Sequence, residues 1–310
     1  MTSITRLGLG CMSMNMANRE RSIECVRYAL DSGVTMLNTG EFYGAGESEM
    51  VLGEALRGVP RDSYFISVKF GVLPQPAGGI YGLDVNPFNV KAHLAYSMHR
   101  LGLDYIDLYQ PARMDESVPV EELMGVLSDL VGEGYIGSIG LTQLSADDLR
   151  RAAQVHPIKM VELAFSVADR SIEDNGILSA ARDNHIDVLA FAVLSHGLLS
   201  DTAGASQASG RRVLSPEQRE HILSGLRQIA TGKETSVENL LQAYVWAKHP
   251  DMSILIGTTR KEHLKDSIDA LSITLTEADV QAIEAAFPAG ALAGMGMRDI
   301  AFRDGRIVRA

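Results

Sequence analysis

The sequence YIDLYQPARMDESVPVEELMGVLSDLVGEGYIGSIGL, residues 105–141, contains the pattern that decides the fold. It joins two short apolar runs, Tyr105–Tyr109 and Gly137–Leu141, through a longer amphipathic stretch, Val120–Gly132. Short apolar runs are typical of strands buried on both faces of a parallel sheet, and a stretch with helical spacing is the usual crossover between them. The segment therefore predicts one strand–helix–strand unit.

The same alternation continues along the whole chain. The other expected strands are Leu7–Cys11, Val34–Asn38, Phe65–Lys69, Lys159–Leu163, Val188–Phe191 and Ser253–Ile256. The other helix-like stretches are Arg21–Ser32, Glu49–Arg57, Pro87–Leu101, Ala146–Val155, Glu173–His185, Val237–His249 and Lys261–Ala270. Eight strands alternating with eight helices are the count of a (β/α)8 TIM barrel. A doubly wound sheet shows the same alternation with fewer strands and is the alternative.

The length of 310 residues accommodates one barrel or two ordinary domains. Because no Pro- or Ser-rich linker divides the chain, we expect a single domain over residues 1–310. Residues 288–310 are rich in Gly and Ala and predict a C-terminal tail, and residues 199–215 predict a long loop after the seventh strand. Loops of that length usually cover a ligand or are disordered.

Composition excludes several classes of function. The formal net charge of −11 disfavours broad contact with nucleic acid or an anionic membrane, because neutralising phosphates needs a basic face. Two cysteines, Cys11 and Cys25, are too few for a disulfide framework or a four-ligand metal site. We see no signal peptide and no apolar run of the ~18–20 residues that span a bilayer. A cytoplasmic protein without membrane or nucleic-acid partners is expected.

Two glycine pairs suggest a nucleotide loop but do not complete one. Gly8-Leu9-Gly10 and Gly44-Ala45-Gly46 both lack the third glycine of G-x-G-x-x-G, and the first lies inside an expected strand. The eight histidines contain no pair at i, i+4, so no metal site is expected.

Barrel enzymes build their sites at the C-terminal ends of the strands. Asn38 ends the second strand, Tyr43 follows five residues later, and Lys69 ends the third strand. A lysine beside a tyrosine would favour the phenolate, so the two side chains together form a candidate proton donor to a carbonyl oxygen. The alternative is a surface tyrosine and a lysine whose ammonium reaches solvent.

The sequence around these residues resembles the aldo-keto reductases. Similar motifs include Asn38-Thr39-Gly40-Glu41-Phe42-Tyr43-Gly44, Leu103-Asp104-Tyr105-Ile106-Asp107-Leu108-Tyr109 and Gly257-Thr258-Thr259-Arg260. The resemblance extends over residues 5–297. It implies a (β/α)8 barrel that binds NADPH at the strand C-termini and reduces small aldehydes or ketones.

The family's catalytic tetrad is Asp, Tyr, Lys and His, and two positions are replaced here. Tyr43 and Lys69 are retained, whereas Asn38 stands at the Asp position and Ala112 at the His position. Asn38 carries no charge, so we expect Lys69 to lose its proton more readily or to draw Tyr43 towards phenolate. Ala112 cannot donate a hydrogen bond, and the space that it leaves could admit a bulkier substrate or another donor such as Arg113 or Gln110.

The resemblance also implies a cofactor site. Thr142 and Gln143 take the positions that hold the nicotinamide carboxamide, Glu162 replaces a usual glutamine, and Phe191 takes the stacking position. Gly197 and Leu199 fall in the loop facing the pyrophosphate. Gly257, Thr258, Thr259 and Arg260 lead into the last barrel helix, where Arg260 would bind the 2′-phosphate of NADP(H). Asp266 and Ser267 take the adenine-contacting positions.

Three functions follow from these observations. The first is an NADP(H)-dependent oxidoreductase acting on a small carbonyl or alcohol through an atypical tetrad. The second is a different reaction on the same scaffold, such as elimination, isomerisation or internal redox, and is suggested by Asn38 and Ala112. The third is a non-catalytic NADPH-binding protein.

Overall fold

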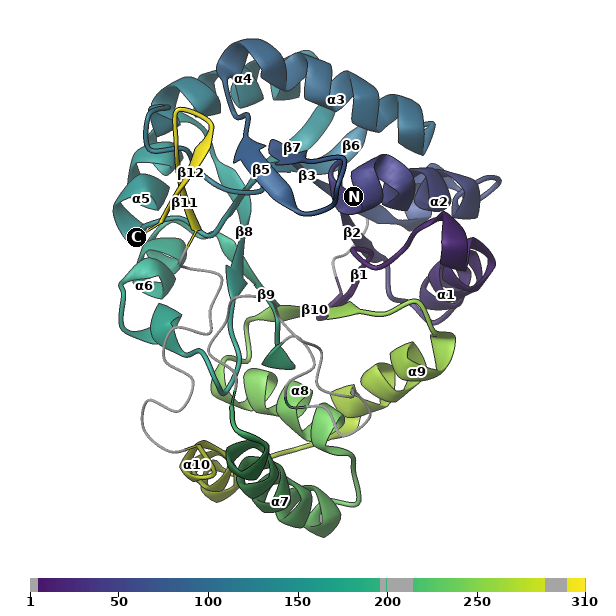
Figure 1. Cartoon of the computed structure of the whole chain (residues 1–310), viewed down its shortest axis with the longest axis vertical. Helices are drawn as coiled ribbons and strands as arrows, with labels where there is room; N and C mark the ends of the chain where they lie inside the picture. The colour runs from purple at the N-terminus through teal and green to yellow at the C-terminus, as the bar shows by residue number, and fades with distance from the viewer. Residues whose placement is uncertain (1–4, 196–198, 200–213, 288–299, 310) are drawn as a thin grey trace.

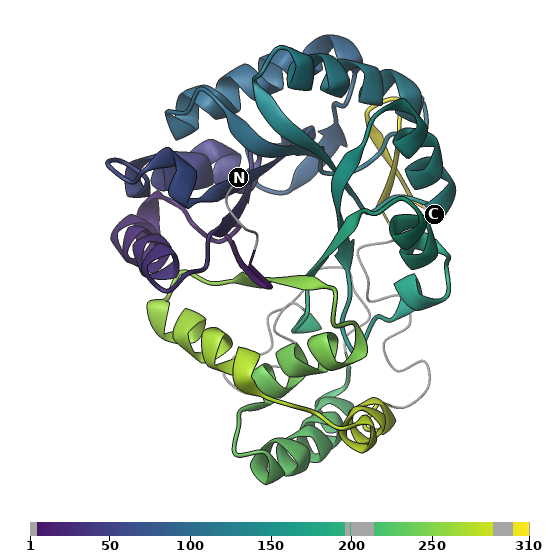
Figure 2. The same ribbon diagram turned by 180° about the vertical axis from the view of Figure 1, so that it is seen from behind.

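Eight parallel strands form a closed barrel in the computed structural model, which describes residues 5–195, 199, 214–287 and 300–309 (Figures 1 and 2). The strands are β1 (Leu7–Gly10), β2 (Met36–Gly40), β3 (Phe65–Phe70), β6 (Ile106–Pro111), β7 (Ile136–Thr142), β8 (Ile158–Ala164), β9 (Asp187–Phe191) and β10 (Ser253–Gly257). Their order around the barrel is β1-β10-β9-β8-β7-β6-β3-β2, and every pair is parallel. The predicted (β/α)8 barrel is confirmed.

Helices surround the barrel as an outer layer, as Figure 1 shows. They are α1 (Arg19–Asp31), α2 (Glu47–Ala55), α3 (Pro87–Leu101), α4 (Val120–Gly132), α5 (Ala146–Val155), α6 (Ile177–Asp183), α8 (Val237–Lys248) and α9 (Lys261–Asp269). Two further helices, α7 (Pro216–Gly232) and α10 (Glu277–Ala285), contact each other outside this layer. The larger apolar core lies between strands and helices, because alternate strand residues face outward.

The inward-facing residues form layers inside the barrel. Met36, Phe65, Leu108 and Met160 belong to one buried apolar cluster, from four different strands. Because side chains two residues apart point to the same face of a strand, the next inward positions are Asn38, Ser67, Gln110 and Glu162. All four of these polar residues are buried. The apolar layer therefore supports a polar layer nearer the carboxyl ends of the strands.

Helix α6 begins later than the sequence pattern predicts. The expected helix Glu173–His185 is a short 3-10 turn at Ser171–Glu173 followed by α6 from Ile177. Gly176 between them has a φ of 83°, in the left-handed region, and interrupts the helical pattern.

Two hairpins lie outside the barrel. Strands β4 (Val72–Pro74) and β5 (Ile80–Leu83) follow β3, and β11 (Ile300–Arg303) and β12 (Arg306–Arg309) end the described chain. They join into one four-stranded sheet in the order β11-β12-β5-β4. Residues 300–309 are thus a docked hairpin, where the sequence indicated only a tail. The pattern missed it because the two strands are short and rich in charge.

The carboxylate of Asp115 is one of the groups that attach the terminal hairpin to the barrel. Asp115, in the loop after β6, accepts hydrogen bonds from the backbone amides of Gly305 at 2.7 Å and Asp304 at 3.1 Å. The amide of Glu116 donates to the Phe302 carbonyl at 2.8 Å, and the Phe302 ring is buried. The hairpin therefore packs on the loop that follows Ala112 and Arg113.

Candidate active site

Lys69, near the end of β3, is buried at the centre of a polar network. Its Nζ donates to Glu162 Oε1 at 2.7 Å and to Asn38 Oδ1 at 2.6 Å, and it is also hydrogen-bonded to Tyr43. Burial alone would lower the pKa of Lys69, but the charge and hydrogen bonds of Glu162 and Tyr43 outweigh it and raise that pKa. The expectation that Lys69 lacks a compensating charge is wrong, because Glu162 supplies one.

The other groups of this network supply further hydrogen bonds, and Gln110 Oε1 is left without a partner among the described residues. Asn38 Nδ2 donates to Glu162 Oε2 at 2.9 Å and to Ser67 Oγ at 3.1 Å. Gln110 Nε2 donates to the same two atoms at 2.8 and 3.2 Å. A Cβ on Gly140 of β7 would lie 2.7 Å from Gln110 Oε1, so this strand needs a glycine where the Gln110 side chain crosses it. The Nε2 donor of Gln110, one of the two alternative donors that the sequence suggested, is thus used within this network.

Tyr43 is half-buried beside Lys69, at the start of a 3-10 turn over Tyr43–Gly46. The centre of its ring lies 5.4 Å from Lys69 Nζ. Gly44, Ala45 and Gly46 all have positive φ. The glycine pair that partly matches a nucleotide-loop motif therefore forms the turn after Tyr43. Burial raises the pKa of Tyr43, and Lys69 offsets only part of that rise. The expected shift towards phenolate is therefore not found.

Ala112 is buried after the end of β6, and Arg113 lies next to it. Arg113 Nη1 donates to the Ala112 carbonyl at 2.7 Å. Burial lowers the pKa of Arg113, while the charge of Glu162 and the phenol of Tyr43 act on the guanidinium in the opposite direction. Arg113 therefore lies near the Tyr43–Lys69 pair, as one of the two alternative donors that the sequence suggested.

A cavity of about 300 Å³ lies beside this group and is lined by Arg113, Gln143, Ala164, Asn175 and Ile300, among others. Ile300 belongs to the terminal hairpin, which thus contributes to the wall of the cavity. Asn175 and Ile300 carried no sequence signal, because their place at the cavity depends on how distant segments pack.

The end of β7 carries the two predicted carboxamide-binding residues. Thr142 is buried, and its Oγ1 has no hydrogen-bond partner among the described residues. Gln143 has a φ of 48°, and its Oε1 accepts a hydrogen bond from the Ala164 amide at 2.8 Å. An unsatisfied buried hydroxyl is costly, so Thr142 is the kind of group that a bound ligand satisfies.

The structure also places the other predicted cofactor residues. Both Glu162 oxygens are engaged by the Lys69 network, and Phe191 is half-buried at the end of β9. Gly257 ends β10, Thr258 and Thr259 are buried, and Arg260 is exposed at the N-terminus of α9. Asp266 is exposed, whereas Ser267 Oγ donates to the His263 carbonyl at 3.0 Å. Leu199 is buried, and Gly197 lies outside the described residues.

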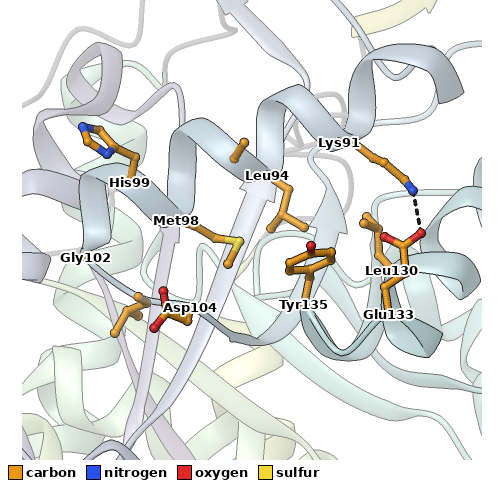
Figure 3. Close-up of a pocket in the computed structure, with 11 residues that line it drawn as sticks. Lys91, Leu94, Met98, His99, Gly102, Asp104, Leu130, Glu133 and Tyr135 are labelled. Atoms are coloured by element: carbon orange, nitrogen blue, oxygen red, sulfur yellow. Dashed lines mark hydrogen bonds and ion pairs between the residues drawn. The ribbon is translucent and has the colours of Figure 1, made fainter.

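A second hollow, of about 790 Å³, lies away from these residues, between α3 and α4. Figure 3 shows Leu94 and Met98 of α3 opposite Leu130 of α4, with Lys91 paired to Glu133 at one end. Over the described ranges, no cluster of His, Cys, Asp or Glu is suited to hold a metal ion. In the same part of the chain, no helix has the length and apolar character needed to cross a membrane.

A closed parallel barrel with Tyr43 and Lys69 at the carboxyl ends of its strands defines a (β/α)8 protein of the enzyme type. Comparison with known sequences then identifies the family. The model of the Aldo/keto reductase family matches residues 6–287, so the chain belongs to that family. The resemblance predicted from the motifs is confirmed.

Two relatives are similar over nearly the full length of this chain. Probable aldo-keto reductase 1 of Glycine max is 31% identical over 307 residues, covering 94% of this chain and 88% of that protein. The aldo-keto reductase yakc of Schizosaccharomyces pombe, whose name specifies NADP(+), is 29% identical over 301 residues. The match covers 92% of this chain and 88% of that protein.

Solved structures show the same fold. The glycerol dehydrogenase of Gluconobacter oxydans superposes with a TM-score of 0.82 at 22% identity, covering 92% of each chain. An aldo/keto reductase of Klebsiella pneumoniae, solved with NADP and acetate, gives a TM-score of 0.73 at 25% identity, again over 92% of each chain.

Proposed function

We propose that the protein is an NADP(H)-dependent oxidoreductase that interconverts a small carbonyl compound and its alcohol. The observation that carries this proposal is the contact between Tyr43 and the ammonium of Lys69 at the carboxyl end of the barrel. The relatives named for NADP, or solved with it, support the choice of cofactor. The buried cysteines Cys11 and Cys25 are both free, which fits a cytoplasmic location.

The residues present fit the cofactor. The Thr142 hydroxyl is buried and unpaired among the described residues, which suits a carboxamide partner. Arg260 is exposed at the N-terminus of α9, where the helix dipole adds to its attraction for phosphate. Thr142, Gln143 and Phe191 would hold the nicotinamide end, and Arg260 with Thr258 and Thr259 the phosphate end. When bound, the reduced nicotinamide supplies the hydride.

Tyr43 is the proposed proton donor to the carbonyl oxygen. It remains protonated near neutral pH because burial raises its pKa, and Lys69 faces the phenol with a positive charge that stabilises the oxygen once the proton has left. Ala112 contributes no hydrogen bond to the oxyanion. We assign the second electrostatic contribution to Arg113, whose guanidinium acts on Tyr43. In this proposal the tetrad positions, taken from the family resemblance, are Asn38, Tyr43, Lys69 and Ala112, with two substituted.

The alternative of a different reaction on this scaffold was suggested by Asn38 and Ala112 together. Since Glu162 pairs with Lys69, the part of that argument that rests on Asn38 is absent, and the part that rests on Ala112 stands. Incubation of a substrate with catalytic NADP⁺ separates the two, because an elimination or isomerisation forms product without net cofactor turnover. No feature of the described residues favours a purely non-catalytic role.

Cofactor binding is tested by fluorescence titration with NADPH and NADH. Replacing Arg260 by Ala removes a charge-assisted contact to the 2′-phosphate and is expected to weaken NADPH binding by about tenfold or more. Binding of NADH, which lacks that phosphate, is expected to stay within about twofold. The control is Lys265→Ala, an exposed cation on the same helix. No binding of NADPH to the wild-type protein at millimolar concentration would overturn the proposal.

A further inference from the structure

Lys69 takes its carboxylate from a different strand than the family pattern indicates. The family resemblance places an aspartate at position 38 on β2 and a glutamine at position 162 on β8. This chain has Asn38 and Glu162 instead, so the carboxylate and the amide have exchanged strands. The two side chains meet inside the barrel, where Asn38 Nδ2 lies 2.9 Å from Glu162 Oε2.

We propose that Glu162 is the positioning residue for Lys69, and that Asn38 must be neutral for Glu162 to hold this place. The inference rests on the proposed function, in which Lys69 supports Tyr43. Glu162 is 2% exposed, and each of its oxygens has a defined partner. Oε1 accepts from Lys69, and Oε2 accepts from the amides of Asn38 and Gln110.

The orientation of Asn38 follows from the charges around it. Its Oδ1 faces the ammonium at 2.6 Å, so its Nδ2 faces the carboxylate. The reverse orientation would direct an amide N–H at the ammonium and an oxygen at the carboxylate. An aspartate at position 38 would bring two carboxylates to hydrogen-bonding distance, and like charges at that separation cannot both remain ionised without cost. The site therefore holds one carboxylate and one amide.

Because the network is buried, an unbalanced charge inside it costs free energy. Lys69 is 5% exposed, and an ammonium in such a place is costly without a partner. Among the described residues, Glu162 is the carboxylate in contact with it. Besides burial, the negative charge of Glu162 opposes formation of the phenolate and raises the pKa of Tyr43. Removing this charge while Lys69 stays protonated therefore lowers the pKa of Tyr43.

The test is a charge exchange between two positions. We compare the wild-type protein with Glu162→Gln and with the double variant Asn38→Asp/Glu162→Gln. Tyrosinate absorbance is followed against pH without cofactor, and each curve is corrected with the matching Tyr43→Phe variant. Glu162→Gln is expected to lower the pH of the Tyr43 transition by about one unit or more. The double variant is expected to return within about half a unit of the wild-type value.

A remote control separates this effect from a general change in charge. Glu133→Gln removes an exposed carboxylate at the end of α4 and is expected to leave the Tyr43 transition unchanged. Circular dichroism checks that each variant is folded. If Tyr43 in Glu162→Gln titrates at the same pH as in the wild-type protein, the role assigned to Glu162 is overturned. A double variant that titrates like Glu162→Gln would overturn it as well, because the carboxylate at position 38 would then not replace the one at position 162.

Activity supplies an independent readout. Glu162→Gln is expected to lower kcat/KM for carbonyl reduction by about tenfold or more, and the double variant to recover most of the loss. If the tyrosinate shifts appear as expected but the wild-type protein never consumes NADPH, the proposed function fails while the role of Glu162 stands. If the wild-type protein reduces carbonyls and Glu162→Gln shifts neither tyrosinate nor rate, the role of Glu162 fails alone.

Discussion

At the scale of residues, Tyr43 and Lys69 make the rates of carbonyl reduction and of alcohol oxidation depend on pH in opposite ways. Reduction needs the phenol, and burial raises the pKa of Tyr43 above its ordinary value of about 10. We therefore expect kcat/KM for carbonyl reduction to be flat through neutral pH and to fall only in strongly alkaline solution. Alcohol oxidation needs the phenolate and should rise with pH over the same range.

Steady-state pH profiles in both directions check this prediction. A reduction rate that falls between pH 6 and 8 would contradict it, because a group with a near-neutral pKa would then control the proton transfer.

Thr142 gives a second residue-scale prediction, in which stability and binding change in opposite directions. Its Oγ1 is buried with no partner among the described residues, so Thr142→Val removes an unsatisfied polar group. The free energy of unfolding of the cofactor-free protein should stay the same or rise by about 1 kcal/mol. NADPH affinity should fall by about fivefold to tenfold, since the carboxamide loses a hydrogen bond.

Denaturant unfolding and fluorescence titration measure the two quantities for Thr142→Val. A variant that is destabilised and binds NADPH normally would show that the hydroxyl serves the fold and not the cofactor.

At the scale of elements, the carboxylate of Asp115 gives the docking of the hairpin β11–β12 a dependence on pH. Although burial opposes it, hydrogen bonds from Ser117 and from the amides of Gly305 and Asp304 hold the pKa of Asp115 below its usual value. A lowered carboxylate pKa contributes stability above the unfolded pKa of about 3.8 and loses it as the pH falls through the folded pKa. We expect the hairpin to undock on acidification below about pH 4.

Asp115→Asn should weaken hairpin docking at neutral pH by about 2 kcal/mol, because two amides lose a charged acceptor. It should also remove the acid dependence. The matched control is Glu116→Gln, whose exposed ion pair with Arg303 should be worth less than about 1 kcal/mol. Hydrogen exchange at residues 300–309 measures the docking. Equal effects of the two substitutions would contradict the role given to Asp115.

At the scale of the whole molecule, the alternation of strands and helices predicted the barrel from the sequence. The expected strand Tyr105–Tyr109 is found as Ile106–Pro111, and Gly137–Leu141 as Ile136–Thr142. Such agreement is possible because a strand buried on both faces is apolar throughout, and this can be recognised locally. Tyr43 and Lys69 were also predictable, because each lies at or after a strand end.

The partner of Lys69 could not be predicted from local patterns. Asn38 and Glu162 are 124 residues apart, and their contact depends on which inward positions of β2 and β8 share a layer. Considered alone, Asn38 indicates a lost charge and Glu162 an altered cofactor contact. Only the closed barrel brings the two side chains into contact, which supports the proposal that Glu162 supplies the charge absent from Asn38. The docking of the hairpin at residues 300–309 could not be predicted for a similar reason, since one of its contacts is with Asp115, far away in the sequence.

The central claim is that this barrel transfers hydride from NADPH to a small carbonyl compound, with Tyr43 supplying the proton. The most direct measurement is the stoichiometry of NADPH loss against alcohol formed over a panel of aldehydes and ketones, for the wild-type protein and Tyr43→Phe. We predict one NADPH consumed per alcohol, and a loss of about 10²-fold or more in rate for Tyr43→Phe with NADPH binding retained. Product formed without net loss of NADPH, or a Tyr43→Phe variant as fast as the wild type, would contradict the account.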